Sequence, residues 1–264
     1  MRQVVATVIS NEKLWGEFSL HGHPKYLSSW LIWLKCPEVA SEAKPGQFIM
    51  VNCGEECLLP RPFSIHQVND DGIALFYAVL VGGKGTSWLS QRHKGARVKL
   101  FGPLGNGFSI ARGSNNLLLV AGGNGIAPLY FLAQDALREK RSVTLLYGTA
   151  DNKRRSIPPH IKLVSATEDG SVGHQGMITD LLPDFISWAD QIFACGPTSM
   201  YQTMATQNLL KTKPVQISLE VRMGCGLSVC YGCTVKTRSG LKQVCKDGPV
   251  FNLDDILWDK PSFI

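Results

Sequence analysis

The sequence predicts a multi-domain β plus α/β protein, with an N-terminal antiparallel β-barrel, a parallel α/β domain and a small C-terminal cysteine-rich domain. Three observations carry this prediction. Short β-rich runs fill the N-terminal part, strands alternate with helical runs in the middle, and four of the eight cysteines lie between residues 225 and 245. We therefore expect domains over residues 1–110, 111–213 and 214–264.

The first domain contains short runs with the composition of strands, separated by Gly and Pro. Many short strands with turn residues between them favour a closed barrel or a sandwich. No run in this domain has the periodicity of a long helix. The predicted strands cover 3–9, 30–35, 47–51, 63–68, 73–80 and 97–101.

The second domain begins with an almost wholly apolar strand, which is typical of a parallel sheet buried on both faces. Strands that alternate with helices indicate a parallel α/β sheet. The expected strands cover 117–121, 142–147 and 191–195, and the expected helices cover 128–140 and 198–210, with Thr198 as an N-cap.

The composition favours a globular, soluble protein, with 44% hydrophobic and 18% charged residues and a net charge of +6. The basic residues form no stripe between aromatic residues, so we expect no nucleic-acid partner. The apolar N-terminal stretch is too short for a signal peptide, and glycines and a proline interrupt the longest apolar run, 117–133. We expect a cytoplasmic protein without a membrane segment.

The C-terminal cysteines have the spacing C-x4-C-x2-C-x11-C, at Cys225, Cys230, Cys233 and Cys245. The first three match the plant-type spacing of a [2Fe–2S] cluster, whose fourth ligand lies further along the chain. Glycines between them allow backbone N–H groups to approach the sulfides. The alternatives are a zinc site, which usually shows paired C-x2–4-C ligands, and a disulfide pair, which is rare in the cytosol.

The tetrapeptide RPFS (61–64) opens a predicted strand and has side chains that suit a flavin nucleotide. Its arginine can pair with a pyrophosphate oxygen, its phenylalanine offers an aromatic surface, and its serine places a hydroxyl near a reactive ring. Gly85 and Thr86 follow in a glycine-rich turn, where backbone N–H groups can hold phosphate oxygens. The alternative is an edge-strand proline beside a solvated arginine.

The segment GGNGIAP (122–128) connects the first α/β strand to a helix. A glycine turn and a helix N-terminus give a dinucleotide pyrophosphate close access to the backbone, although the G-x-G-x-x-G pattern is absent. The segment CGP (195–197) ends another strand, where open α/β sheets bind ligands. Cys195 is a candidate neighbour of a nicotinamide; the alternative is a buried, inert thiol.

The order of these motifs resembles the ferredoxin–NADP reductase superfamily, and within it the electron-transfer subunits of class 1B dihydroorotate dehydrogenases. The stretches that carry the resemblance span nearly the whole chain. They are RPFSIH (61–66), FGPLGNGF (101–108), GGNGIAPLYFLA (122–133), CGPTSM (195–200), EVRMGCGLSVCYGC (220–233) and VCKDGPVF (244–251).

The resemblance implies an oxidoreductase that carries FAD and a [2Fe–2S] cluster, uses NAD(H), and works in pyrimidine biosynthesis. Its partner would be an FMN-containing catalytic subunit that oxidises dihydroorotate, in a heterotetramer with two of each subunit. Ser64 and Cys195 would be the catalytic residues. The residues implied are Arg61, Pro62, Phe63, Ser64, Ala78, Val79, Leu80, Gly85 and Thr86 for FAD, Gly122, Gly123, Gly125, Pro128, Gly196 and Pro197 for the nicotinamide nucleotide, and Cys225, Cys230, Cys233 and Cys245 for iron.

Some features leave alternatives open. The basic residues 153–155 could favour NADP(H), or be a solvated loop. Similar cluster loops occur in electron-input subunits of sulfite reductases and hydrogenases, and a non-enzymatic redox sensor is a further possibility. We expect His66 to be structural, and the segment 21–29 and the cysteines outside the motifs have no assigned role.

Overall fold

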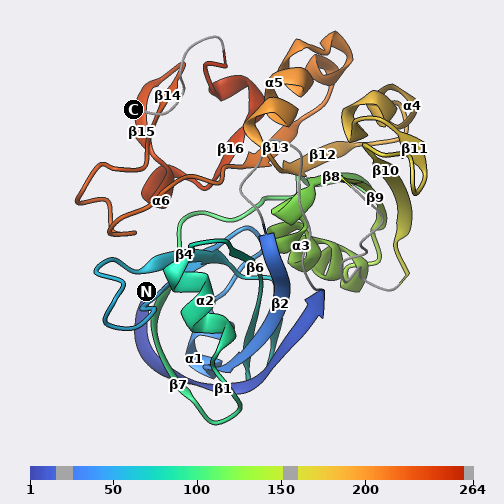
Figure 1. The fold of residues 1–264 in the computed structure, drawn as a ribbon. Coiled ribbons are helices and arrows are strands. Elements are labelled where there is room, and N and C mark those ends of the chain that lie inside the picture. The colour runs from blue at the N-terminus through green and yellow to red at the C-terminus, as the bar shows by residue number, and fades with distance from the viewer. Residues whose placement is uncertain (16–25, 151–159, 259–264) are drawn as a thin grey trace.

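The computed structural model describes residues 1–15, 26–150 and 160–258. The predicted basic residues 153–155, and the first five residues of the segment 21–29, lie outside these described residues. In Figure 1 the chain passes from a curled β-sheet (blue to cyan) through an α/β domain (green to orange) to a C-terminal part (red). The predicted fold class is confirmed.

The N-terminal part is a curled seven-stranded sheet in which every neighbouring pair of strands is antiparallel, in the order β4-β3-β7-β1-β2-β6-β5. Its strands are β1 (Arg2–Trp15), β2 (Tyr26–Lys35), β3 (Phe48–Val51), β4 (Arg61–Ser64), β5 (Gln67–Asn69), β6 (Gly72–Leu80) and β7 (Arg97–Leu104). Two short helices, α1 (Pro37–Ala40) and α2 (Lys84–Ser90), connect them.

Strand β6 joins the barrel to the second domain because both of its faces are covered. Side chains alternate between the two faces of a strand. Leu75 and Tyr77 therefore belong to the barrel core, whereas Phe76 between them packs with the core of the α/β domain. The outer face of β6 thus forms one wall of the space between the two domains.

The second sheet has the order β11-β10-β9-β8-β12-β13-β16 and is parallel except for β16, which runs antiparallel to β13. Its strands are β8 (Asn116–Gly122), β9 (Ser142–Thr149), β10 (Lys162–Thr167), β11 (His174–Gln175), β12 (Gln191–Cys195), β13 (Val215–Ser218) and β16 (Val250–Asn252). Its helical elements are η1 (Gly123–Gly125), α3 (Ile126–Arg138), η2 (Ile178–Leu181), α4 (Leu182–Ile186), α5 (Thr198–Thr206) and η3 (Asn208–Thr212).

The C-terminal part adds a hairpin of β14 (Thr234–Thr237) and β15 (Gly240–Gln243), followed by α6 (Val244–Asp247) and η4 (Leu253–Asp255). Strands β13 and β16 lie beyond residue 213, yet they extend the α/β sheet. The division at residues 110 and 213 stays a prediction.

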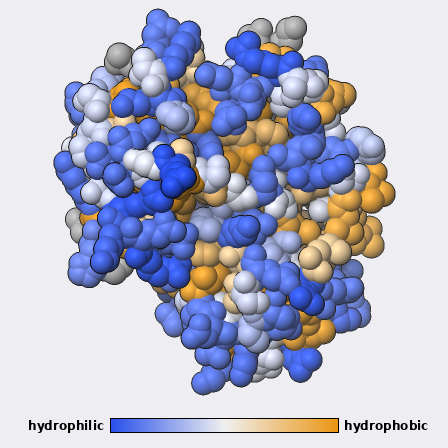
Figure 2. Space-filling model, turned by 180° about the vertical axis from the view of Figure 1, so that it is seen from behind, coloured by the Kyte–Doolittle hydropathy of each residue, from blue (hydrophilic) through white to orange (hydrophobic). Residues whose placement is uncertain are grey.

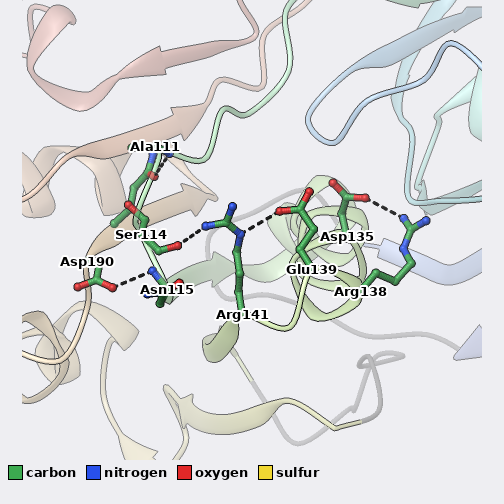
Figure 3. Close-up of polar contacts among 9 residues, drawn as sticks. Ala111, Ser114, Asn115, Asp135, Arg138, Glu139, Arg141 and Asp190 are labelled. Carbon is green, nitrogen blue, oxygen red and sulfur yellow. Dashed lines mark hydrogen bonds and ion pairs between the residues drawn. The ribbon is translucent and has the colours of Figure 1, made fainter.

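A polar network fixes the segment that links the barrel to β8 (Figure 3). A carboxylate oxygen of Asp190 accepts hydrogen bonds from the backbone N–H groups of Asn115 and Asn116, at 2.9 and 2.8 Å. These bonds hold the pKa of Asp190 below its usual value. Arg141 donates to the carbonyl of Ser114 and pairs with Glu139 at 3.0 Å. The start of β8 is therefore tied to the α/β domain on both sides.

Several element boundaries differ from the expectation. The predicted strand 63–68 is two strands, β4 and β5, and the predicted helix 198–210 is α5 followed by η3. Thr198 as N-cap is wrong, because Pro197 is the N-cap residue and no side chain caps this helix. Helix α2 was not expected, since its sequence KGTSWLS is a weak helix former. The side-chain amide of Asn11 donates to the carbonyls of Leu89 and Arg92 at 3.0 and 2.7 Å, and so supports the end of α2 from outside.

Figure 2 shows that the rear face of the molecule is mostly hydrophilic, with apolar residues exposed in separate patches. In the described ranges, no helix is both long enough and apolar enough to cross a membrane.

Candidate functional site

A cavity with a volume of about 730 Å³ lies between the barrel, the start of α3 and the segment after β13. Six of the residues predicted to bind FAD line it, namely Arg61, Pro62, Phe63, Ser64, Ala78 and Thr86. The opposite wall comes from Asn124, Ala127, residues 218–223 and Pro249. The structure therefore brings together side chains that lie far apart in the sequence, such as those of Arg61 and Pro249.

Three predicted FAD residues, Val79, Leu80 and Gly85, do not line this cavity. Val79 belongs to the barrel core and is 4% exposed. Gly85 lies beneath Arg61, and a Cβ atom at this position would be 2.9 Å from Cγ of Arg61. A glycine thus allows the first turn of α2 to pack against the arginine stem.

Arg61 has donors left for an anion. Its Nη1 donates to the backbone carbonyl of Leu59 at 2.8 Å, which fixes the orientation of the guanidinium. Among the described residues no carboxylate pairs with it. Because a guanidinium carries five N–H donors, the remaining ones can bind a phosphate in the cavity.

A second cavity of about 300 Å³ opens at the carboxyl ends of the parallel strands. Ligands of open α/β sheets bind at this edge. Of the residues predicted to bind the nucleotide, Gly122, Gly123, Gly196 and Pro197 line this cavity, and Gly125 and Pro128 do not. The other walls come from residues 148–150, Glu168, 176–179 and α5.

The glycines let the two predicted nucleotide motifs meet. A Cβ atom at Gly125 would be 1.9 Å from the carbonyl oxygen of Cys195, and one at Gly122 would be 2.7 Å from Cδ of Pro197. Real Cβ atoms do not come this close to other atoms, so larger residues would push the two loops apart. Gly125 therefore acts through packing rather than by lining the cavity.

Cys195 is fully buried and lines neither cavity. Its Sγ lies 3.7 Å from Oε1 of Glu220, and burial, reinforced by the Glu220 carboxylate, raises the pKa of the thiol well above its usual value. The thiol therefore stays protonated and donates to Glu220. Its role beside a nicotinamide stays a prediction.

Two residues that the sequence analysis did not single out, Asn124 and Glu220, line both cavities. The Oδ1 atom of Asn124 is buried and accepts no hydrogen bond from the described residues. An acceptor left in this state costs free energy unless a ligand donates to it. The signal was present, because Asn124 lies inside the glycine turn and Glu220 begins the segment before the first clustered cysteine.

His66 connects the barrel to helix α3. Its Nδ1 lies 2.9 Å from the carbonyl oxygen of Ala127, and its ring is 4.4 Å from that of Tyr130 between centroids. Burial lowers the pKa of His66 to about 4, so the ring is neutral and its Nδ1 donates to the carbonyl. The interdomain hydrogen bond is consistent with the structural role expected for this residue.

All eight cysteines are free thiols. Among the four clustered ones, the backbone N–H of Cys245 donates to Sγ of Cys233 at 3.5 Å. In the part of the chain that the structure describes, no three His, Cys, Asp or Glu side chains converge on a point that could hold a single metal ion.

Backbone N–H groups surround the clustered sulfur atoms. Cys225 Sγ accepts from Leu227, Val229 and Cys230 at 3.3 to 3.5 Å, and Ser228 donates to Cys245 Sγ at 3.3 Å. Burial raises the pKa of Cys225, but these N–H groups outweigh it and lower the pKa to about 7. Donors of this kind stabilise a ligating thiolate.

The small residues of the loop leave room beside the sulfur atoms. A Cβ atom at Gly224 would be 3.3 Å from Cys230 Sγ, and one at Gly226 would be 2.6 Å from Cγ of Met50 in the barrel. Gly226 has a φ of +69°, and Ser228 and Tyr231 are also left-handed. The tight winding and the inward N–H groups fit an iron–sulfur cluster.

The fold and these sites define a reductase with the ferredoxin–NADP reductase fold and an added iron–sulfur domain. Residues 220–257 match the family model of the iron–sulfur cluster binding domain of dihydroorotate dehydrogenase B. The chain is similar to a solved structure of an NADH-dependent reduced ferredoxin–NADP oxidoreductase, which was described for flavin-based electron bifurcation. The match covers 97% of this chain and 91% of that chain, with a TM-score of 0.81 and 26% identity. A ferredoxin NADP+ reductase from Neisseria gonorrhoeae with bound FAD and NADP covers 81% of this chain and 93% of its own, with a TM-score of 0.62 and 17% identity, and shows the fold alone.

The chain belongs to the family of dihydroorotate dehydrogenase B (NAD(+)) electron transfer subunits. It is 37% identical to the member from Desulforamulus reducens over 236 residues, which are 84% of this chain and 90% of that protein. It is 38% identical to the member from Clostridium acetobutylicum over 213 residues, which are 80% of this chain and 85% of that protein.

Proposed function

We propose that this chain passes electrons between NAD(H) and a catalytic subunit that oxidises dihydroorotate with FMN, through an FAD and a [2Fe–2S] cluster of its own. One observation carries the proposal. The two cavities share Asn124 and Glu220, and the larger cavity reaches Met223, two residues before Cys225. This arrangement supports a series in which a nucleotide site adjoins a flavin site and the flavin site lies near a cluster site.

The larger cavity is the proposed FAD site. The guanidinium of Arg61 and the backbone N–H groups at the start of α2 bind the diphosphate of FAD. Ser64 lies on the same strand as Arg61, and its hydroxyl contacts the flavin ring. Phe63 packs edge-on against Tyr77 with centroids 5.8 Å apart, which keeps the floor of this cavity apolar. A bound flavin supplies the exchange between a hydride, which carries two electrons, and a cluster, which takes one.

The smaller cavity is the proposed NAD(H) site. Its glycine loops bring backbone N–H groups to the nucleotide, and Asn124 offers an unpaired acceptor where this cavity meets the larger one. Glu168, at the end of β10, places a carboxylate in its wall. A carboxylate there repels a 2′-phosphate and favours NAD(H) over NADP(H).

The clustered cysteines are the proposed cluster ligands, and their loop faces outward. Cys230 is exposed, and the apolar side chains of Val229 and Tyr231 on either side of it are 73% and 68% exposed. Leu59 of the barrel, 53% exposed, lies 3.8 Å from the position of a Cβ atom at Gly224. These residues form the proposed contact surface for the catalytic subunit, in a cytoplasmic heterotetramer with two copies of each chain.

The test is reconstitution of the complex. The FMN-containing catalytic subunit encoded by the same genome is purified alone and together with this chain, and dihydroorotate-dependent reduction of NAD+ is followed at the NADH absorbance. We expect reduction only when this chain is present. NAD+ reduction that starts from ferredoxin or a sulfur substrate, and not from dihydroorotate, would overturn the substrate assignment.

A further inference from the structure

The turn after β7 holds the segment that follows the last clustered cysteine. Asn106 Nδ2 donates to the carbonyls of Asp247 and Val250 at 2.9 and 3.0 Å, and its Oδ1 accepts from the N–H of Val250 at 3.0 Å. Its backbone N–H donates to the carbonyl of Gly248 at 2.7 Å. One barrel residue thus makes four hydrogen bonds to three residues of the C-terminal part, Asp247, Gly248 and Val250.

The turn itself is anchored and closely packed. Gly105 has a φ of +71°, and a Cβ atom there would be 2.6 Å from both the carbonyl oxygen of Gly248 and Cδ of Pro249. The Gln47 side chain donates to the carbonyl of Gly105 at 2.8 Å and ties the turn to the start of β3. The barrel therefore presents Asn106 in a fixed position.

The segment that Asn106 holds has a cluster ligand at one end and the flavin cavity at the other. Cys245 lies two residues before Asp247, and Pro249 lines the larger cavity. Val250 then begins β16 of the α/β sheet. A shift of this segment would change the separation between the proposed cluster and the proposed flavin, while Arg61, Ser64 and the nucleotide loops would stay in place.

We propose that Asn106 is a positioning residue for electron transfer between the flavin and the cluster, an inference that rests on the proposed function. With both groups bound, a reduced FAD would pass one electron at a time to the cluster, and NADH would be the source of the electrons. Asn106 does not touch the reacting atoms. It fixes the segment between Cys245 and Pro249, and so fixes the distance over which the electron moves.

The test uses three variants of the complete complex. Asn106→Ala removes all three side-chain hydrogen bonds, and Asn106→Asp keeps the acceptor for Val250 while it removes the amide donor. Asn252→Ala is the matched control, because Asn252 is an exposed asparagine of the adjoining strand β16 whose side chain, among the described residues, bonds to Asp255 alone, at 3.0 Å.

Two reactions are compared in each variant. NADH-driven reduction of ferricyanide reports the flavin, and stopped-flow absorbance with freeze-quench EPR reports reduction of the cluster. We expect Asn106→Ala to slow cluster reduction severalfold, because electron transfer slows as the two groups move apart, with ferricyanide reduction unchanged. The rate of cluster reduction in Asn106→Asp should lie between those of Asn106→Ala and the wild type, and the rate in Asn252→Ala should equal that of the wild type.

Hydrogen exchange gives a readout that does not depend on turnover. In Asn106→Ala the amides of residues 244–250 exchange faster, with iron and flavin contents unchanged. Equal slowing of both reactions, a loss of iron, or no change in either reaction would overturn the inference. A wild-type complex that shows no flavin, no cluster or no NADH oxidation would instead overturn the proposed function, so the two failures are distinguishable.

Discussion

The thiol of Cys195 donates a hydrogen bond to a carboxylate oxygen of Glu220, across a sulfur–oxygen distance of 3.7 Å. Glu220 lines both cavities, whereas Cys195 is buried behind it. The hydrogen bond therefore joins the buried thiol to a carboxylate that lies where the two cavities meet.

The first prediction concerns this pair. Cys195→Ala removes the donor and leaves the Glu220 carboxylate less restrained, so we expect the rate of flavin reduction by NADH to fall about 10- to 100-fold, as for other small losses of alignment. Stopped-flow flavin absorbance measures that rate. Cys36→Ala, which removes a buried thiol of the barrel core, is the control and leaves the rate unchanged. Equal rates of flavin reduction in the two variants would show that Cys195 has no role in this step.

The second prediction is a pH dependence of stability from His66. Its pKa is lowered by burial from 6.5 to about 4, so between these values the unfolded chain binds a proton that the folded chain does not. The stability contributed by the neutral ring is present above pH 6.5 and is lost as the pH falls toward 4, at up to ~1.4 kcal/mol per pH unit. Thermal unfolding of His66→Gln over this range should show a smaller pH slope than the wild type. An identical slope in both proteins would show that His66 titrates normally.

The third prediction concerns the iron ligands. Cys230→Ser removes an exposed ligand, so we expect most of the iron and the EPR signal of the cluster to be lost, while NADH-driven ferricyanide reduction persists. The melting temperature Tm should also fall by several degrees, because metal binding contributes to folding free energy. Cys57→Ser, a half-buried thiol outside the cluster, is the control. Retention of iron in Cys230→Ser would exclude that cysteine as a ligand.

The fourth prediction concerns the choice of nucleotide. Glu168 lines the smaller cavity, so the wild type should prefer NADH. Glu168→Arg exchanges a repulsive charge for one that pairs with a 2′-phosphate, and should raise kcat/KM for NADPH about 10- to 100-fold, the effect of ~1–3 kcal/mol. Glu168→Gln removes the repulsion of the 2′-phosphate without adding a cation, so its kcat/KM for NADPH shows how much of the effect comes from each change. A wild type that already prefers NADPH would contradict this assignment.

The sequence was sufficient for the elements whose pattern is local. The strand 191–195 matches β12, and the apolar run 117–121 lies within β8, because a strand buried on both faces has an unmistakable composition. The predicted position of RPFS on a strand is confirmed, and the structure adds that this strand lines the larger cavity.

The rest depended on contacts between distant residues. Helix α2 is supported at its end by Asn11, and strand β10 is exposed at its start and buried only at its end, so neither could be recognised from the local sequence. Gly85 and Gly125, which are predicted cofactor contacts, line neither cavity, and their lack of a Cβ atom allows the close approach of Arg61 and of the Cys195 carbonyl. Glu220 reaches both cavities only through the placement of the segment after β13 beside the barrel.

The most direct test of the account is an anaerobic titration of the purified native complex with NADH, followed by absorbance and EPR. The account predicts one FAD and one [2Fe–2S] cluster for each copy of this chain, both reduced by NADH and both reoxidised when orotate is added. Reduction of the flavin without any reduction of the cluster, or zinc in place of iron at the four cysteines, would contradict it.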